Sequence, residues 1–290
     1  MSIGVALAGG GLKGLAHIGA LQALEELGID IDFLSGTSSG SLFATLYALG
    51  YTTEEIKNIT LENYKLITKI RKKAILKGLY SFLRTGVVQM DGLVDGNDIE
   101  KIIKKYADKK SVVNMNDLKI AYAISSVDTI STKQVIFLSK EIANEEKVVG
   151  TEEVDYVYGA PISLATRASM AFPGIYTPCQ YQKYNFIDGG TKDNLPIHVL
   201  KNMGAKKTIA LSFKIDDYKP KKDILAILLR TCDIFSLKDV RKAQKEADLS
   251  IEIDAKGASL LEINNAEQMV NQGYTTIMNH KNEIYNLIRN

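Results

Sequence analysis

The stretch Gly36-Thr37-Ser38-Ser39-Gly40 stands between two largely apolar runs, residues 31–34 and 42–49. This order predicts a strand, an abrupt turn and a helix, and G-x-S-x-G in that setting is typical of a nucleophile elbow. The glycines flank a serine in a cramped backbone conformation, so a side chain at either glycine should collide with a neighbouring strand or helix. Ser38 then lies at the tip of the turn, beside helix N–H groups that stabilise negative charge. The alternative is a serine-rich turn that only caps the helix.

The segment before the elbow predicts a second functional loop. Ile3–Leu7 reads as a buried parallel strand, followed by Gly9-Gly10-Gly11-Leu12-Lys13-Gly14 and a helix with apolar residues at helical spacing up to Leu27. The first 50 residues therefore form a β-α-β-α unit. It has a glycine loop after the first strand and a serine turn after the second.

The glycine loop has two interpretations. Gly9, Gly11 and Gly14 satisfy G-x-G-x-x-G, and Asp30 or Asp32 follows about 20 residues later, as in a dinucleotide-binding fingerprint. However, both acids come before or early in the second strand, whereas the ribose-binding acid should end it. A loop of bare N–H groups beside an exposed serine fits an oxyanion hole better. Dinucleotide binding remains the second hypothesis.

The rest of the chain alternates between strands and helices. We expect strands at 119–126 and 133–139 (a hairpin, or neighbours across the turn at 128–129), at 184–187, at 207–213 and at 249–253. Helices are expected at 161–170, 196–203, 224–247 and from about residue 265. This order predicts a single α/β domain over residues 1–290, with a mostly parallel central sheet sandwiched by helices and the elbow after the second strand. The motifs fall within about 3–213, and residues 220–290 add C-terminal α/β elements.

Composition excludes several classes of protein. A net charge of +2 gives no general reason to expect nucleic acid binding, and the two cysteines form neither a metal-ligand spacing nor a disulfide framework. No apolar run reaches the roughly 20 residues that a spanning helix needs, and no basic residue precedes the apolar N-terminus. We expect a soluble, cytoplasmic protein.

Residues 53–110 are expected to be helical and rich in lysine. Between Lys57 and Arg84 the only acid is Glu62, and apolar residues interleave with the cations at roughly helical spacing. A basic amphipathic segment suits an anionic membrane surface, with peripheral contact through four lysines. The alternative is the solvated face of a helical cap over the active site. The four lysines are Lys65, Lys69, Lys72 and Lys73.

A nucleophilic serine needs a base. A conventional triad would use His17, His198 or His280, and Ser38, Asp188 and His198 formally satisfy the order serine, acid, histidine. His198, however, falls in a predicted helix only ten positions after the acid. Asp188 ends a predicted strand and is followed by Gly189 and Gly190, which let the backbone turn sharply towards another loop. We therefore expect Asp188 to be the base.

Four motifs together resemble the patatin-like phospholipases. They are the glycine loop at residues 9–14, the elbow at 36–40, the Ala168–Pro178 stretch (ASMAFPGIYTP) and Asp188-Gly189-Gly190. The resemblance covers about residues 3–213 and implies a lipid acyl hydrolase with a Ser-Asp dyad and no histidine. It makes Ser38 the nucleophile, Asp188 the base, and Gly9, Gly10 and Gly11 with Ser39 the oxyanion hole, while Lys13, Gly14, Gly36, Gly40, Gly189 and Gly190 support these motifs. Lys13 departs from the family's usual arginine, so a bidentate role for that side chain is not expected.

The predicted chemistry follows from these parts. Asp188 accepts the Ser38 proton as Oγ attacks an ester carbonyl, N–H groups of Gly10 or Gly11 and of Ser39 hold the oxyanion, and water releases the acyl-enzyme. A site partly closed to water should raise the basicity of the carboxylate. We expect no cofactor, no metal and no calcium requirement. A catalytically idle lipid-binding domain is the third hypothesis.

Overall fold

The computed structural model describes residues 2–142, 154–215, 224–255 and 265–289, and it is organised around one nine-stranded sheet. Five neighbouring strands, in the order β9-β8-β1-β2-β3, run parallel. β4 is antiparallel to β3, and β5 is parallel to β4. The strands of this path are β1 (Ile3–Leu7), β2 (Phe33–Thr37), β3 (Ala121–Asp128), β4 (Gln134–Leu138), β5 (Val154–Tyr158), β8 (Lys207–Phe213) and β9 (Leu249–Ile253).

Two further strands complete the sheet beside the elbow. β7 (Tyr184–Asp188) pairs antiparallel with the last residues of β3, and β6 (Cys179–Tyr181) pairs with β7. β3 is eight residues long, so it extends past the end of β2 and offers its last residues to β7. β2 and β7 therefore lie end to end along the same edge of β3.

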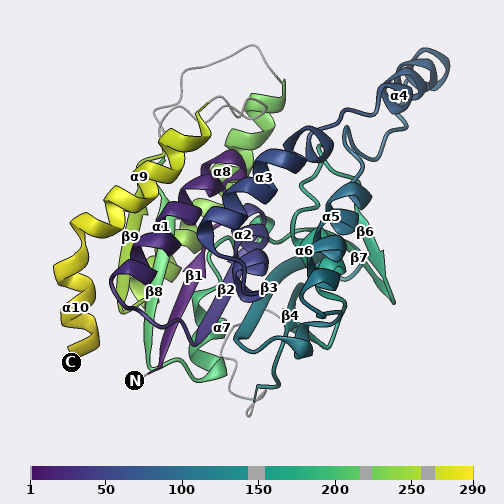
Figure 1. Cartoon of the computed structure of the whole chain (residues 1–290). Helices are drawn as coiled ribbons and strands as arrows, with labels where there is room; N and C mark the ends of the chain where they lie inside the picture. Colours follow the sequence, from purple (N-terminus) through teal and green to yellow (C-terminus); the bar gives the residue numbers. More distant parts are fainter. Residues whose placement is uncertain (1, 143–153, 216–223, 256–264, 290) are drawn as a thin grey trace.

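Helices cover both faces of the sheet (Figure 1). One face packs against α1 (Leu15–Glu26), α2 (Ser39–Ala48), α3 (Thr53–Ile67), α5 (Asn97–Lys109), α6 (Ile162–Ser169) and α9 (Ala266–Asn279), which share the largest buried cluster. α7 (Ile197–Met203) and the end of α8 (Ile224–Glu246) bury a second cluster with β1 and β8. Strands such as β1 are apolar throughout because both of their faces are buried.

The N- and C-terminal parts of the chain touch through two helix backbones. Gly19 of α1 and Gly273 of α9 face each other: a Cβ at Gly19 would overlap the Val270 carbonyl oxygen, and a Cβ at Gly273 would overlap that of Ala16. Only glycine lets these two helices approach so closely. α10 (Lys281–Arg289) follows α9 after a break at His280.

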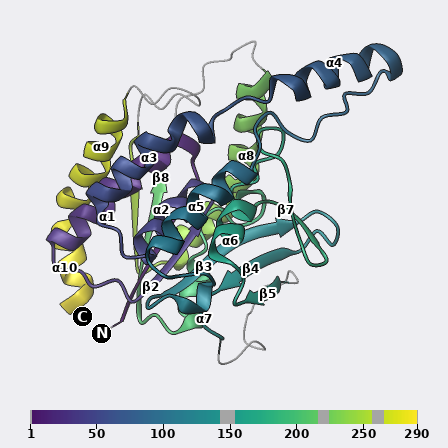
Figure 2. The same cartoon turned by 45° about the vertical axis from the view of Figure 1, so that its right-hand side comes forward.

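One helix does not join these layers. α4 (Lys72–Thr85) projects from the body, and residues 86–93 return alongside it (Figures 1 and 2). We call residues 71–93 the α4 arm. At its root the two ends of the arm are tied together, because Arg71 N–H donates to Leu93 O at 2.7 Å. The return segment then joins the body, where Leu93 N–H donates to Gly174 O at 3.3 Å and Val94 N–H donates to Ile175 O at 2.7 Å.

The structure confirms the predicted class, a mostly parallel sheet between helices with the elbow after the second strand. Strands β3 and β4 are antiparallel neighbours, as the 128–129 turn indicated. β5 and β6 were not predicted from the sequence, and α9 and α10 were predicted as one helix. Of the predicted 224–247 helix, all but the last residue lies in α8.

Candidate active site

The elbow takes the strained form that its sequence predicted. Ser38 follows β2 and precedes α2 with φ 53° and ψ −126°, a backbone conformation that non-glycine residues rarely adopt. A Cβ at Gly36 would lie 2.8 Å from the backbone of Gly40, and a Cβ at Gly40 would overlap the Leu7 carbonyl oxygen. The predicted collisions at both glycines are confirmed. The strain at Ser38 persists because packed backbone surrounds it.

A buried serine on another helix holds the elbow from outside. The Ser38 N–H donates to Oγ of Ser169 at 2.9 Å, and Ser169 is fully buried at the end of α6. On the other side, Oγ of Ser41 donates to the Ser38 carbonyl oxygen at 2.6 Å. The backbone of Ser38 is thus fixed at both its N–H and its C=O. Ser169 belongs to one of the four motifs but was not predicted to have a role of its own, because it lies 131 positions from Ser38 in the sequence.

Strand register brings Ser38 and Asp188 together. Thr37, the last residue of β2, pairs with Ser125 of β3, and Asp188, the last residue of β7, pairs with the next residue, Ser126. Because β2 and β7 abut on the same edge of β3, the residue after Thr37 meets the end of β7. The structure therefore joins two motifs that lie 150 positions apart in the sequence.

The Asp188 carboxyl is buried and is held on one side only. Its Oδ1 accepts the Gly190 N–H at 2.8 Å, which fixes the carboxyl against η4 (Gly189–Thr191). Its Oδ2 has no hydrogen bond of good geometry within the described part of the chain. Burial raises the pKa of Asp188 from 3.8 to about 6, although the hydrogen-bonding interactions with the Ser38 hydroxyl and the Gly190 N–H partly oppose this rise. The free oxygen and the raised pKa both suit a carboxylate that must accept a proton.

The other two supporting glycines of this strand end are also packed. A Cβ at Gly189 would overlap the carbonyl oxygen of Ser125, and a Cβ at Gly190 would lie 3.1 Å from Asp188 Oδ1. The sharp turn predicted after Asp188 is therefore present, as the short helix η4. It leads directly to Asn194, whose backbone and side chain both reach the glycine loop.

The glycine loop lies against the elbow, and the N–H groups of Gly9 and Gly10 already have partners. Gly9 N–H donates to the Asn194 carbonyl oxygen at 3.2 Å, and the Asn194 side-chain amide donates to the Gly9 carbonyl oxygen at 3.2 Å. Gly10 N–H donates to Ser39 Oγ at 3.1 Å. Within the described residues, the N–H groups of Gly11 and Ser39 form no hydrogen bond. Of the predicted oxyanion donors, these two are unoccupied.

The predicted loop residues Gly11, Lys13 and Gly14 differ in conformation and in burial. Gly11 has φ 58° and is open to solvent, Lys13 lies in the short helix η1 (Gly11–Gly14), and Gly14 is buried where a Cβ would lie 2.6 Å from Ser39 Oγ. Asn194 was not predicted as a site residue. An asparagine six positions after Asp188 gives no signal in the sequence that distinguishes it from an ordinary turn residue.

All three histidines have partners other than Ser38 and Asp188. His17 is buried and bonded to the Ala8 carbonyl oxygen at 2.9 Å, and burial lowers its pKa to about 4. His198 Nδ1 lies 3.6 Å from Oδ2 of Asp193, and His280 bonds the Thr276 carbonyl oxygen at the end of α9. The triad of Ser38, Asp188 and His198 is not formed in this structure.

One aromatic side chain, Tyr176, and one thiol, Cys232, lie near Asp188. Burial raises the pKa of Tyr176, and the nearby phenol of Tyr64 and carboxyl of Asp188 raise it further. The pKa of the Cys232 thiol on α8 is raised by burial and then by Asp188. Both groups therefore lie close enough to the Asp188 carboxyl to interact with it electrostatically.

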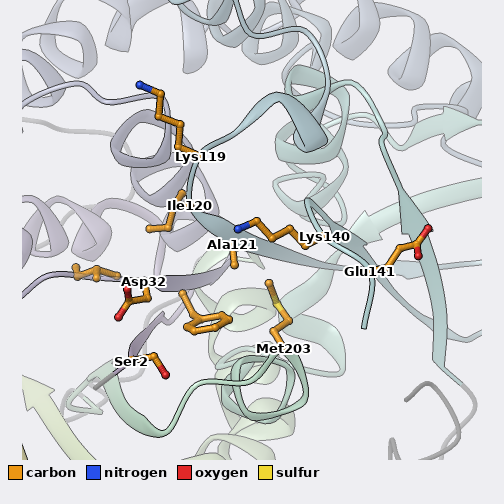
Figure 3. Close-up of a pocket in the computed structure, with 10 residues that line it drawn as sticks. Ser2, Asp32, Lys119, Ile120, Ala121, Lys140, Glu141 and Met203 are labelled. Carbon is orange, nitrogen blue, oxygen red and sulfur yellow. The ribbon is translucent and has the colours of Figure 1, made fainter. Parts of the chain in front are cut away.

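The geometry of a dinucleotide site is absent. Asp32 precedes β2 and accepts the Ile3 N–H at 2.8 Å, so it lies at the opposite end of the strands from the glycine loop. That end carries a separate hollow of about 670 Å³, shown in Figure 3, which Asp32 lines together with Lys119, Lys140 and Met203. An acid there cannot contact a ribose whose phosphates lie at Gly9–Gly14.

Two other kinds of feature, a metal-binding cluster and a membrane-spanning helix, are absent from the described ranges. Their side chains contain no group of three or more His, Cys, Asp or Glu residues arranged to hold a metal ion. Among the same residues, no helix combines the length and the apolar character required to cross a bilayer. The four predicted membrane-contact lysines (Lys65 on α3, Lys69, and Lys72 and Lys73 on α4) are all exposed.

Comparison with known proteins agrees with this geometry. Lysophospholipase NTE1 of Meyerozyma guilliermondii is 28% identical over 220 residues, which are 76% of this chain and 13% of that protein. YqhO of Bacillus subtilis is 27% identical over 240 residues, 77% of this chain and 76% of YqhO. The chain thus spans only a small part of the fungal relative's length. VipD from Legionella pneumophila has the same fold, with a TM-score of 0.53 at 15% identity over 97% of this chain and 67% of VipD.

The family model of the patatin-like phospholipases matches residues 5–201. This range contains the glycine loop, the elbow, Ser169 and the Asp188 turn, which are the parts that the fold brings together around Ser38. The chain belongs to the patatin-like phospholipase family.

Proposed function

We propose that this protein is a serine lipid acyl hydrolase that cleaves fatty acyl esters through an acyl-enzyme on Ser38. The observation that carries the proposal is the pairing of a strained serine with a buried aspartate whose pKa is raised to about 6. A carboxylate of ordinary pKa is a weak base for a hydroxyl, and burial brings this one closer to neutral pH. Family membership and the lysophospholipase named among the relatives support a lipid ester as the substrate.

The reaction begins at Asp188. Its Oδ2 accepts the proton of the Ser38 hydroxyl as Oγ attacks the ester carbonyl carbon, while Oδ1 stays bonded to the Gly190 N–H. The carbonyl oxygen becomes an oxyanion, and the unoccupied N–H groups of Gly11 and Ser39 stabilise it. The proton on Asp188 passes to the leaving alcohol, which departs and leaves the acyl chain on Ser38. Water then attacks the acyl carbonyl carbon while Asp188 accepts its proton. That proton passes to Ser38 Oγ as the Oγ–acyl bond breaks, which releases the fatty acid and restores the serine hydroxyl.

We also propose that the substrate is reached at a membrane surface. Lys65, Lys69, Lys72 and Lys73 are exposed and form no ion pair with a described residue, so their charges are available to anionic lipid headgroups. We propose a cytoplasmic location with peripheral membrane contact.

A fluorophosphonate probe tests the nucleophile directly. Wild-type protein should be labelled on Ser38, and Ser38→Ala should not be labelled. The same two proteins should then be compared on p-nitrophenyl esters of graded chain length and on a lysophospholipid and a diacyl phospholipid. Folded wild-type protein that neither reacts with the probe nor hydrolyses any ester would contradict the proposal and favour an idle lipid-binding domain.

A further inference from the structure

The α4 arm exposes an apolar helix face that the rest of the protein leaves uncovered. At 3.6 residues per turn, the apolar side chains of α4 gather on one side over roughly 160° of the helix surface. All of them are exposed, with Leu83 at 77% and Leu76 at 65%. The six residues of this apolar face are Ile75, Leu76, Leu79, Tyr80, Phe82 and Leu83.

The opposite side of α4 packs against the returning segment of the arm. Ser81 Oγ donates to the Val87 carbonyl oxygen at 2.9 Å and accepts the Gln89 N–H at 2.9 Å. Gly78 lies against Val88, where an added Cβ would come within 3.2 Å of its side chain. The returning segment thus packs on small residues and turns the apolar face away from itself. Both views show the arm standing clear of the body (Figures 1 and 2).

Cations border this apolar face and line its root. Lys73, Lys77 and Arg84 follow one edge of the helix. At the root, a groove of about 1390 Å³ lies between the start of α4 and the returning segment. It is lined by Lys69, Arg71, Lys72, Lys73 and Lys77, and its one acid, Asp91, is engaged with Arg71 at 2.8 Å. An apolar face with a cationic border is complementary to an anionic lipid surface, whereas a second copy of the arm would place like charges together.

Backbone hydrogen bonds connect the arm root to the candidate active site. Val94, next to the arm, pairs with residues 175–177 through its N–H and its C=O. Tyr176, in this segment, lies close enough to Asp188 for the two groups to interact electrostatically. An arm seated in a membrane would therefore hold Ser38 near the lipid surface.

We propose that the α4 arm inserts its apolar face among the acyl chains of an anionic bilayer, with lipid phosphates bound in the lysine-lined groove at its root. Insertion would bring the active site to lipid substrates, and this consequence for lipid hydrolysis rests on the proposed function. Insertion itself does not require Ser38, so it is measured on the Ser38→Ala variant as well. The two proposals can then fail separately.

The absence of tryptophan makes insertion directly observable. Leu83→Trp provides the chain's only tryptophan at the centre of the apolar face. On addition of vesicles of phosphatidylcholine with phosphatidylglycerol, its emission should move to shorter wavelength, and lipids brominated in the acyl chains should quench it. Val113→Trp is the matched control, because Val113 is 56% exposed and lies in the connection that leads into the opposite end of the sheet. Its emission should stay unchanged.

A second set of variants separates insertion from charge. Leu76→Gln, Leu79→Gln and Leu83→Gln together should weaken vesicle binding roughly 100-fold, since three apolar side chains lose their burial. This loss should persist at high salt, whereas the loss caused by Lys69→Gln, Lys72→Gln and Lys73→Gln should shrink there. Val113→Gln should bind like wild type, and hydrolysis of a short soluble ester should be the same in all four proteins.

Specific results overturn the proposal. If the Leu83→Trp emission shifts with protein concentration and without lipid, the apolar face is a contact between copies of this chain. If bromolipids fail to quench it on bound vesicles, the arm does not insert. Insertion without Ser38-dependent ester hydrolysis would sustain the arm's role and reject the hydrolase proposal.

Discussion

The elbow and the α4 arm differ in how the rest of the protein holds them: the elbow is strained but tightly packed, whereas the arm is unstrained but exposed. Four pieces of chain surround Ser38, and their contacts hold it at φ 53° although serine rarely adopts that conformation. The α4 arm has an unstrained helix, yet little beyond its own return segment packs on it, and its largest side chains face solvent. Packing at the elbow maintains a geometry that the local sequence disfavours. The arm instead keeps apolar surface that a fold usually buries, which is costly unless something else covers it.

The largest expected effect lies in the dyad. Asp188→Asn and Ser38→Ala should each lower kcat on a soluble ester by several decades, since the base and its nucleophile act as one unit. Circular dichroism should show both variants folded. His198→Ala and His280→Ala are the controls and should keep most of the activity. Equal loss in folded His198→Ala would replace the dyad with a triad.

Two glycine-to-alanine changes compare the two regions directly. Gly36→Ala should lower the free energy of unfolding by about 3 kcal/mol or more, because its Cβ meets the backbone of Gly40 at 2.8 Å. Gly86 ends α4 at φ 72° with nothing within 4 Å of an added Cβ, so Gly86→Ala should cost only about 1 kcal/mol. Urea denaturation measures both. Similar values would mean that the elbow is less tightly held than its contacts indicate.

The raised pKa of Asp188 predicts opposite effects on activity and stability. kcat/KM should rise with pH up to about 6 and level off above it, because only the carboxylate accepts the serine proton. The folded state holds this proton more tightly than the unfolded state, so the free energy of unfolding falls as pH rises from about 4 to 6. Asp188→Asn should therefore be more stable than wild type by up to about 3 kcal/mol at pH 7, with no such gain near pH 4. Thermal unfolding at the two pH values checks this, and a gain that is independent of pH would contradict it.

Ser169 should contribute a smaller, catalytic effect. Ser169→Ala leaves the Ser38 N–H without its acceptor, and a lost buried hydrogen bond of this kind costs about 1–2 kcal/mol. kcat should fall about tenfold with little change in KM, because the nucleophile is displaced and the substrate contacts are kept. Ser163→Ala on the same helix is the matched control, since Ser163 is also buried. A fall of equal size in both variants would indicate general loosening of α6.

The smallest effect on stability is expected on the arm. Leu83→Gln should change the free energy of unfolding by no more than about 0.5 kcal/mol, because Leu83 is 77% exposed in the free protein. Leu24→Ala on α1, a fully buried position, should cost about 2–5 kcal/mol. A large loss in Leu83→Gln would show that the arm folds back onto the body in solution.

Sequence alone was sufficient where one short segment contains its own signal. The strained elbow, the glycine collisions at Gly36 and Gly40 and the parallel layers could be read from turn residues and apolar periodicity. β5 and β6 were missed for a physical reason: β6 has three residues, and β5 is mostly half-buried and so lacks a clear apolar pattern. Both strands exist because neighbouring strands supply their partners.

In the candidate active site, too, local motifs were predicted and long-range contacts were not. Ser38 and Asp188 were chosen from separate motifs, but only the β3 register explains why they meet. Ser169 and Asn194 act on residues more than 100 positions away, so no local pattern could reveal them. The sequence predicted that residues 53–110 are helical and basic. It could not predict that α4 leaves the body, because an amphipathic pattern does not indicate what covers the apolar side.

The contact between Gly19 and Gly273 has a consequence for how this protein is divided. The family match ends at residue 201, yet the first helix after the glycine loop packs backbone to backbone on α9, far beyond that point. The range that the family model matches is therefore shorter than the packed fold, which includes α9. A shortened protein ending near residue 213 would contain every catalytic motif and would expose one side of α1. Such a fragment should aggregate rather than report on the chemistry, so the full 290 residues are the unit in which the dyad should be studied.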